Sequence, residues 1–266
     1  MMCNRPGGWL MKDKHEDMKK YRYFLKDNIR LITDFSQTDQ SRGVKPPPVE
    51  KPFLIESKRI VLIKPDKWQN INETDLISAI KNRKSHRKYS NEPLSAEELS
   101  FLLWATQGVK KNLGSTVLRN VPSAGNRHPF ETYLCILNVA DFEPGIYRYL
   151  PLEHELLFEF GYGSRQELAE KLGIATLGQF FIGTAAAAFI WAAIPYRTEW
   201  RYGIASHKVI AIDAGHVCQN LYLACEAIGA GACAVAAYNQ ELMDKLIKVN
   251  GEDEFVIYLA PVGKIS

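Results

Sequence analysis

Two hydrophobic periodicities organise the chain from about residue 72 onward. Apolar residues three and four apart predict helices, two of which start at Ser-x-x-Glu capping boxes. The predicted helices cover residues 74–82, 95–108, 164–173 and 208–228. The first carries Leu76, Ile77 and Ile80 at helical spacing, and the second is expected to bury Leu99, Leu102 and Leu103.

Strands are predicted where apolar or alternating runs are bounded by turn residues. The predicted strands cover residues 131–139, 146–149, 155–160, 185–194 and 254–262. The second and third of these form a hairpin, and the run at 185–194 is apolar throughout, which indicates a fully buried strand. Helices and strands do not alternate regularly, so the pattern indicates an α+β fold.

The first 70 residues differ from the rest of the chain. A charged stretch with aromatic residues is followed by a polar segment and then by the proline-rich run 45–52. Three consecutive prolines favour an extended backbone and cannot lie inside a helix or a central strand. We expect an N-terminal arm over residues 1–70, laid over the body or over a partner subunit, and one domain over residues 71–266. Disorder of the arm is the alternative, and its aromatic residues argue against it.

The composition is that of an ordinary globular protein. Hydrophobic residues make up 46% of the 266 residues and charged residues 24%, which is enough for a sizeable core. The net charge of +3 is too small to indicate a nucleic-acid or membrane partner. The longest apolar run is far shorter than the ~20 residues of a membrane-spanning helix, and the N-terminus has no secretory pattern. These features predict a cytoplasmic protein.

Several familiar site patterns are excluded. The five cysteines form no C-x-x-C pair and the six histidines no H-E-x-x-H pattern, so no metal site is predicted and the cysteines are interpreted as reduced core residues. Residues 229–234 look like a dinucleotide-binding glycine motif. They follow a predicted helix instead of a strand, and that reading therefore fails.

Two polar segments are candidates for binding. In the cationic run 83–88, Arg83, Ser85 and Arg87 would project together from an extended backbone. Two guanidinium groups and a hydroxyl suit a phosphate dianion, although a solvated charge run is the alternative. The loop 121–129 offers small residues and an Asn side chain that could face a flat heterocycle, or it is an ordinary connection.

Taken in order, segments of the chain resemble the nitroreductase-like FMN-dependent oxidoreductases, specifically their SagB/ThcOx-type dehydrogenase branch. The matching segments are 83–87, 92–99, 103–108, 121–125, 144–149, 214–221 and 258–263. The resemblance covers about residues 72–266. It implies a nitroreductase-like α+β fold, with a central mixed or antiparallel sheet flanked by helices, in an intertwined homodimer.

The resemblance also implies noncovalent FMN at the subunit interface, with NAD(P)H as the electron donor. The phosphate would be held by Arg83, Ser85 and Arg87, with Lys264 adding charge. Gly263 is also implied as a cofactor-binding residue. The residues implied to approach the flavin ring from the neighbouring subunit are Pro122, Ser123, Ala124, Gly125 and Asn126. Backbone amides at Ala236 and Ala237 would lie near flavin N5, where a donor stabilises the reduced ring.

The catalytic positions implied by the resemblance are Arg201 and Tyr202. Azoline dehydrogenases of this branch carry a Lys-Tyr pair, and the lysine is replaced here by Arg201. Arginine stays protonated, so it can anchor an anion but cannot act as a general base. We therefore expect NAD(P)H-linked reduction of small electrophilic acceptors such as nitroaromatics or quinones. The alternatives are azoline oxidation in a peptide and a non-catalytic flavin-binding subunit of a biosynthetic complex.

Overall fold

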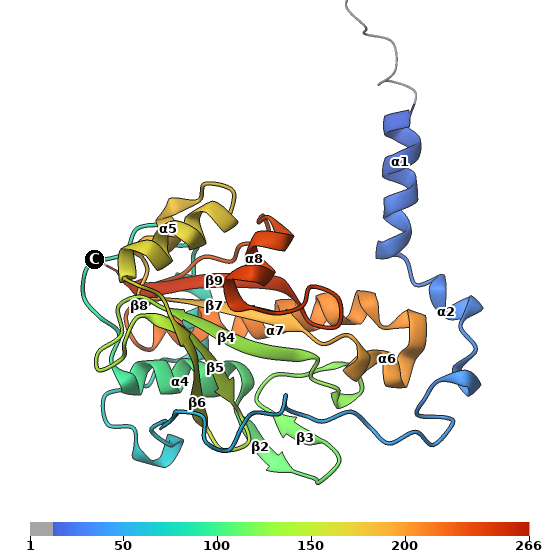
Figure 1. The fold of residues 1–266 in the computed structure, drawn as a ribbon, viewed down its shortest axis with the longest axis horizontal. Coiled ribbons are helices and arrows are strands. Elements are labelled where there is room, and N and C mark those ends of the chain that lie inside the picture. The colour runs from blue at the N-terminus through green and yellow to red at the C-terminus, as the bar shows by residue number, and fades with distance from the viewer. Residues whose placement is uncertain (1–12, 266) are drawn as a thin grey trace, which may run out of the picture.

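A seven-stranded sheet forms the centre of the molecule (Figure 1). The computed structural model describes residues 13–265. The strand order is β1-β6-β5-β4-β7-β9-β8, and each neighbouring pair is antiparallel. The strands are β1 (Arg59–Val61), β4 (Phe130–Ile136), β5 (Gly145–Leu150), β6 (Glu155–Gly161), β7 (Ala187–Ala193), β8 (Ala230–Ala232) and β9 (Phe255–Lys264).

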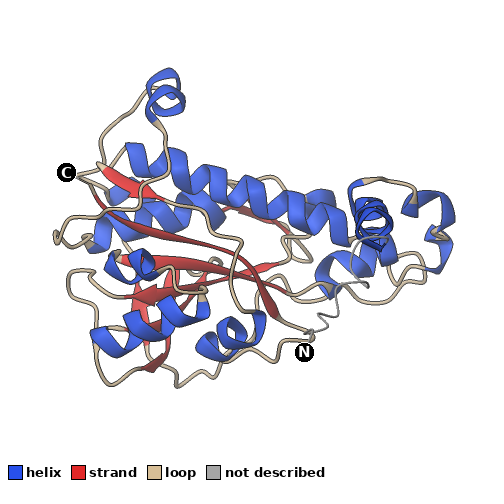
Figure 2. Ribbon diagram, turned by 90° about the horizontal axis from the view of Figure 1, so that it is seen from above, coloured by secondary structure: helices blue, strands red, loops and turns tan. Residues whose placement is uncertain are grey.

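Helices cover both faces of this sheet (Figures 1 and 2). On one face lie α4 (Ala96–Gln107) and α7 (His207–Glu226), and on the other α5 (Arg165–Ala175) and α8 (Gln240–Ile247). Every residue of β4 and β7 is buried, because helices pack on both sides of these central strands. The predicted α+β fold is confirmed, and the sheet is antiparallel.

The two predicted capping boxes differ in outcome. At α4 the box is complete, because Ser95 and Glu98 exchange hydrogen bonds between side chain and backbone. At α5, Ser164 accepts from the backbone of Glu167, but the Glu167 carboxylate accepts from Gly163 N at 3.2 Å instead. That helix also passes the predicted end at Gly173. A Cβ there would lie 2.4 Å from the Phe180 ring, so the glycine serves close packing and does not end the helix.

Other elements were only partly predicted. The helix α3 (Leu76–Asn82) forms, but Leu76, Ile77 and Ile80 are 65%, 79% and 59% exposed. The hairpin of β2 (Val109–Asn112) and β3 (Val117–Arg119) was not predicted, and neither were the short strands β1 and β8. The remaining helices are α1 (Asp13–Tyr21), α2 (Ile29–Ile32) and α6 (Tyr196–Tyr202).

The arm lies over the body of its own chain. Helix α1 projects away from the body, and the chain then returns along the sheet (Figure 1). The backbone carbonyl of Lys51 accepts from Arg148 Nη1 at 2.8 Å, and its amide donates to Glu131 Oε1 at 2.8 Å. Glu131 is buried and also binds Arg148 and Arg197, so the arm is tied to a buried ion network. Residues 1–12 of the predicted arm lie outside the described residues.

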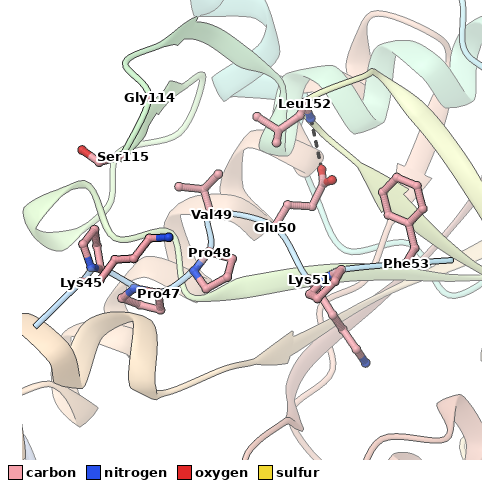
Figure 3. A pocket seen from close by; sticks show the side chains of 12 residues that line it. Lys45, Pro47, Pro48, Val49, Glu50, Lys51, Phe53, Gly114, Ser115 and Leu152 are labelled. Atoms are coloured by element: carbon pink, nitrogen blue, oxygen red, sulfur yellow. Dashed lines mark hydrogen bonds between the residues drawn. The ribbon is translucent and has the colours of Figure 1, made fainter. Parts of the chain in front are cut away.

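The proline-rich part of the arm borders a cavity of about 740 Å³ (Figure 3). Gly114 and Ser115, in the turn between β2 and β3, line its other side. Within the cavity wall the Glu50 carboxylate accepts from Leu152 N at 3.2 Å. Glu50 is 9% exposed, so this acidic side chain is held inside the contact between arm and body.

Among residues 13–265, none of the helices combines the length and apolar character needed to cross a membrane. Four cysteines in this range, Cys135, Cys218, Cys225 and Cys233, are buried with free thiols, whereas Cys3 lies outside it. The described residues contain no metal-binding group of three or more His, Cys, Asp or Glu side chains.

Candidate functional site

The cationic segment after α3 runs along the edge of the sheet formed by β8 and β9. His86 N donates to Ala232 O at 2.9 Å, and Ser90 N donates to Lys264 O at 2.9 Å. Ser85 also pairs with Ala232 as an isolated parallel bridge. The segment is therefore extended and fixed by backbone hydrogen bonds. In such a backbone, alternate side chains share one side, as the sequence pattern requires.

Two glycines allow this close approach. A Cβ at Gly231 would lie 2.6 Å from the His86 ring, and one at Gly263 would lie 3.0 Å from the Tyr89 ring. The predicted cofactor residue Gly263 therefore serves the packing of Tyr89 in this structure. Gly231 belongs to β8, which follows a helix, so the glycine motif at 229–234 is a strand segment and not a dinucleotide turn.

Tyr222 of α7 organises the cationic segment. Its hydroxyl lies 2.9 Å from Ser85 Oγ and accepts from Ala234 N at 2.7 Å. The Arg83 guanidinium lies over its ring, 5.2 Å from the centroid. Within the described residues, neither Arg83 nor Arg87 forms an ion pair, so two positive charges flank the Ser85 hydroxyl without a carboxylate partner. Sequence reasoning missed Tyr222, because its helical spacing is that of a core residue.

Lys264 is placed next to this segment, but its charge is already paired. Its Nζ donates at 2.6 Å both to Glu98 Oε1 and to the carbonyl of Ile228. The side chain of Lys264 thus points to α4, whereas its backbone carbonyl accepts a hydrogen bond from Ser90 N. A role of Lys264 in holding a phosphate stays a prediction and would require the ammonium to be shared with Glu98.

The predicted ring-facing loop is fixed by one carboxylate. Ser123 Oγ donates to Asp213 Oδ2 at 2.6 Å, and Ala124 N donates to the same oxygen at 3.1 Å. Asn126 donates through Nδ2 to Thr116 Oγ1 at 2.8 Å. Burial raises the pKa of Asp213, and the two donors oppose that shift. Nothing in the pattern of α7 had distinguished this acidic residue from the small residues around it.

Within this loop, Pro122 and Gly125 remain exposed. Gly125 has φ +57°, a left-handed conformation that glycine adopts without strain. A Cβ on it would lie 2.5 Å from Tyr202 Oη and 2.6 Å from Arg201 Cδ. The structure therefore brings the predicted ring-facing loop and the predicted catalytic pair together.

The last predicted pair, Ala236 and Ala237, lies in the exposed connection between β8 and α8. Gln179 Nε2 donates to the Ala237 carbonyl at 2.8 Å, and Val235 just before the pair is bonded to Leu259 of β9. The backbone of the pair is thus held in place while its small side chains leave it accessible.

The cationic segment and the loop lie on opposite sides of α7. They are attached through Tyr222 and Asp213, nine positions apart on that helix. Nine residues correspond to a rise of about 13 Å and a rotation of about 180°. In one chain, the two predicted halves of the site are therefore attached to opposite sides of α7.

Comparison with known proteins decides the family. Residues 80–264 match the model of the Nitroreductase family. The chain belongs to the nitroreductase family. A relative from Methanocaldococcus jannaschii that carries the nitroreductase name is 33% identical over 195 residues, which cover 73% of this chain and 93% of the relative. The nitroreductase family consists of flavin-type oxidoreductases, and this chain is an oxidoreductase of that general type.

Solved structures of the nitroreductase fold agree with this assignment. A structure from Ralstonia eutropha that carries the nitroreductase name has a TM-score of 0.64 at 26% identity, and the match covers 83% of this chain and 94% of the other. A chain of the Escherichia coli microcin synthetase complex has a TM-score of 0.58 at 19% identity and covers 99% of this chain, which shows a shared fold. The predicted nitroreductase-like family is confirmed, whereas the SagB/ThcOx-type branch stays a prediction.

Proposed function

We propose that this nitroreductase-family protein is an FMN-dependent homodimeric enzyme that uses NAD(P)H to reduce small electrophilic acceptors such as nitroaromatics or quinones. One observation carries the proposal. Arg83 and Arg87 have no carboxylate partner in the described chain, and they flank Ser85 on a segment fixed to the sheet edge. When bound, FMN supplies the chemistry of accepting and donating hydride.

The donor set fits the phosphate of FMN. Guanidinium groups form charge-assisted, often bidentate bonds to phosphate oxygens, and a serine hydroxyl adds a neutral donor. Tyr222 holds Ser85 by a hydrogen bond, and its ring lies 5.2 Å from the Arg83 guanidinium. Part of the conformational entropy of these side chains is thus already lost in the free protein, which reduces the entropy cost of cofactor binding.

The placement of the two halves supports the proposed homodimer. The loop 122–126 and the cationic segment lie on opposite faces of α7, so a flavin that contacts both is more easily shared between two chains. A two-fold axis would place the loop of one subunit against the cationic segment of its partner. The dimer would therefore contain two equivalent flavin sites.

The chain's own contribution to chemistry lies next to the loop. The Tyr202 hydroxyl faces Gly125 and is a candidate proton donor for the acceptor. Arg201 keeps its charge and is suited to orient an anionic or carbonyl group, with Gln40 of the arm accepting from its Nη1 at 3.2 Å.

The test measures flavin content and affinity together with NADH- and NADPH-dependent reduction of menadione and a nitroaromatic acceptor. Arg83→Ala and Arg87→Ala should each weaken FMN binding by about 1.5–3 kcal/mol, the scale of a charged hydrogen bond. Arg83→Lys should recover part of the loss, since a point charge replaces a planar fork. Arg165→Ala, at an exposed position of α5, is the matched control. Unchanged flavin affinity in both variants of the segment would place the phosphate elsewhere.

A further inference from the structure

Two arginines lie beside the ring-facing loop, and neither has a counter-charge within the described part of the chain. The Arg127 guanidinium lies over the Trp200 ring, 5.0 Å from its centroid, and that of Arg201 lies 5.4 Å from the centroid of Tyr202. Burial lowers the pKa of Arg127, and the neighbouring charge of Arg201 lowers it further. The two cations are therefore close enough to repel each other.

Their hydrogen-bonding capacity is also incompletely used. The Nε atoms of Arg127 and Arg201 are buried and have no hydrogen-bond partner in the structure. No carboxylate among residues 16–265 forms an ion pair with either of them. Their polar contacts are to neutral groups, at 3.5 Å from Arg127 to Asn126 O and 3.2 Å from Arg201 to Gln40. Buried donors of native proteins are nearly always satisfied, so we expect these two guanidinium groups to take an acceptor from a bound molecule.

The arm completes this arrangement. Gln40 N donates to Trp200 O at 2.9 Å, and Trp200 Nε1 donates to Val44 O at 2.9 Å. From the same arm, the Arg30 guanidinium lies 5.7 Å from the centroid of the Tyr202 ring. The arm thus fixes Trp200, whose ring supports Arg127, while the charge of Arg30 is already paired with Asp27 at 2.9 Å.

We propose that Arg127 and Arg201 form a binding site for an oxyanion, a carboxylate or a phosphate, on the molecule that exchanges electrons with the flavin. The inference rests on the proposed function and names its substrate class. Guanidinium groups supported by aromatic rings keep planar N–H edges for such an anion, and desolvation strengthens the attraction. Repulsion between the two cations is relieved when the anion binds.

Two reactants could carry the oxyanion. An acceptor could bring a carboxylate, and the nicotinamide donor brings phosphates. The holoenzyme is therefore assayed with 4-nitrobenzoate and with its uncharged methyl ester, and in parallel with NADPH and NADH at a fixed concentration of the ester. The variants are Arg127→Gln and Arg201→Gln, with Arg165→Gln on α5 as the control.

For an acceptor carboxylate, each variant should lower kcat/KM for 4-nitrobenzoate about 10–100-fold, mainly through KM, and the loss for the uncharged ester should be about 10-fold smaller. If the oxyanion is a phosphate of the electron donor, each variant should instead raise the KM of the nicotinamide nucleotide by the same factor. The KM values of the two acceptors should then not change. Both patterns support an oxyanion site and assign its source. In both cases the affected KM should rise with salt more steeply in the unaltered enzyme than in the variants.

Equal losses on acid and ester with an unchanged KM for the nucleotide would overturn the inference, and so would loss of FMN in Arg127→Gln. Calorimetric titration with benzoate separates this result from failure of the proposed function. If the protein oxidises no NAD(P)H but binds benzoate, and Arg201→Gln abolishes that binding, the oxyanion site stands while the proposed function falls. Absence of benzoate binding together with normal nucleotide KM values in both variants would refute the site.

Discussion

Ser123 and Asp213 are joined by a 2.6 Å hydrogen bond across ninety positions of sequence. The same carboxylate accepts from Ala124 N, so a single side chain of α7 sets the conformation of the loop proposed to face the flavin. Burial raises the pKa of Asp213, and the donors from the loop compensate for part of the cost of burying it. The loop is therefore ordered before any ligand binds.

Asp213→Ala should destabilise the protein and loosen this loop. Removing the acceptor leaves the Ser123 hydroxyl and the Ala124 amide without a partner, which costs about 1–3 kcal/mol for a buried group. We expect a loss of that size in the free energy of unfolding from urea denaturation, and weaker FMN binding. Asp213→Asn keeps one acceptor oxygen and should retain part of both. Flavin affinity unchanged in Asp213→Ala would show that the loop does not need this anchor.

Gly215 on α7 provides a test of the dimer. Glycine inside a helix costs roughly 0.5–1 kcal/mol relative to alanine, so its presence calls for a packing reason. A Cβ at this position would meet no atom of the described part of its own chain within 4 Å, and Ala211, Ile212 and Gly215 are exposed on α7. The small residues Ala211 and Gly215 permit close approach of another subunit.

Gly215→Phe should therefore leave the fold of a single chain intact and weaken the dimer. Sedimentation at micromolar concentration would report the mass, and circular dichroism the fold. Because the proposed flavin site is shared between chains, FMN should be lost together with the dimer. A variant that stays dimeric, or a monomer that keeps one FMN per chain, would contradict the proposal.

The sequence predicted elements best where local signals agree with burial. The apolar run of β7 and the capping box at Ser95 are both local, and both were predicted correctly. Apolar spacing in α3 predicted the helix but could not tell that Ile77 would be exposed. The contact of Gly173 with Phe180 depends on a turn outside the helix, and the Asp213 anchor depends on a residue ninety positions away. Neither leaves a pattern in a single sequence.

Glu50 should give the arm a pH-dependent stability. Burial raises its pKa to about 7, although the bond from Leu152 N and the charge of Arg119 oppose the shift. The folded protein then holds a proton that the unfolded chain releases between its ordinary pKa of 4.5 and about 7. Stability from this group is therefore present below pH 4.5, is lost as the pH rises through this window, and changes no further above it.

Glu50→Gln should remove that slope, because the amide keeps an acceptor for Leu152 N and does not titrate. Urea denaturation at pH 5, 6, 7 and 8 would compare the variant with the unaltered protein, with Glu56→Gln as a control at an exposed position of the arm. We expect the variant to be the more stable of the two at pH 8, and the difference to shrink toward pH 5. A constant difference across the series would show that Glu50 does not titrate in this window.

The residue at position 201 distinguishes the two candidate activities, which are reduction of small acceptors and oxidation of thiazoline rings. Azoline dehydrogenases of the resembling branch carry a lysine where this chain has Arg201, and a lysine beside Arg127 could lose its proton, which arginine does not. The unaltered holoenzyme should therefore not oxidise a thiazoline peptide.

Tyr202→Phe should slow the reduction of acceptors that need a proton by about 10²–10⁴-fold, and it should spare quinones that solvent protonates.

Arg201→Lys is the sharper variant, because it keeps the positive charge and restores a group that can act as a base. Thiazoline-dependent flavin reduction, followed by absorbance under anaerobic conditions, would be compared among Arg201→Lys, Arg201→Ala and the unaltered chain. We expect Arg201→Ala to raise the KM of an anionic acceptor more than it slows flavin reduction by NAD(P)H. Thiazoline oxidation gained only in Arg201→Lys would indicate an azoline enzyme altered at one residue. Efficient thiazoline oxidation by the unaltered chain would refute the proposed function, because it would show that a permanently protonated arginine is no obstacle to that reaction.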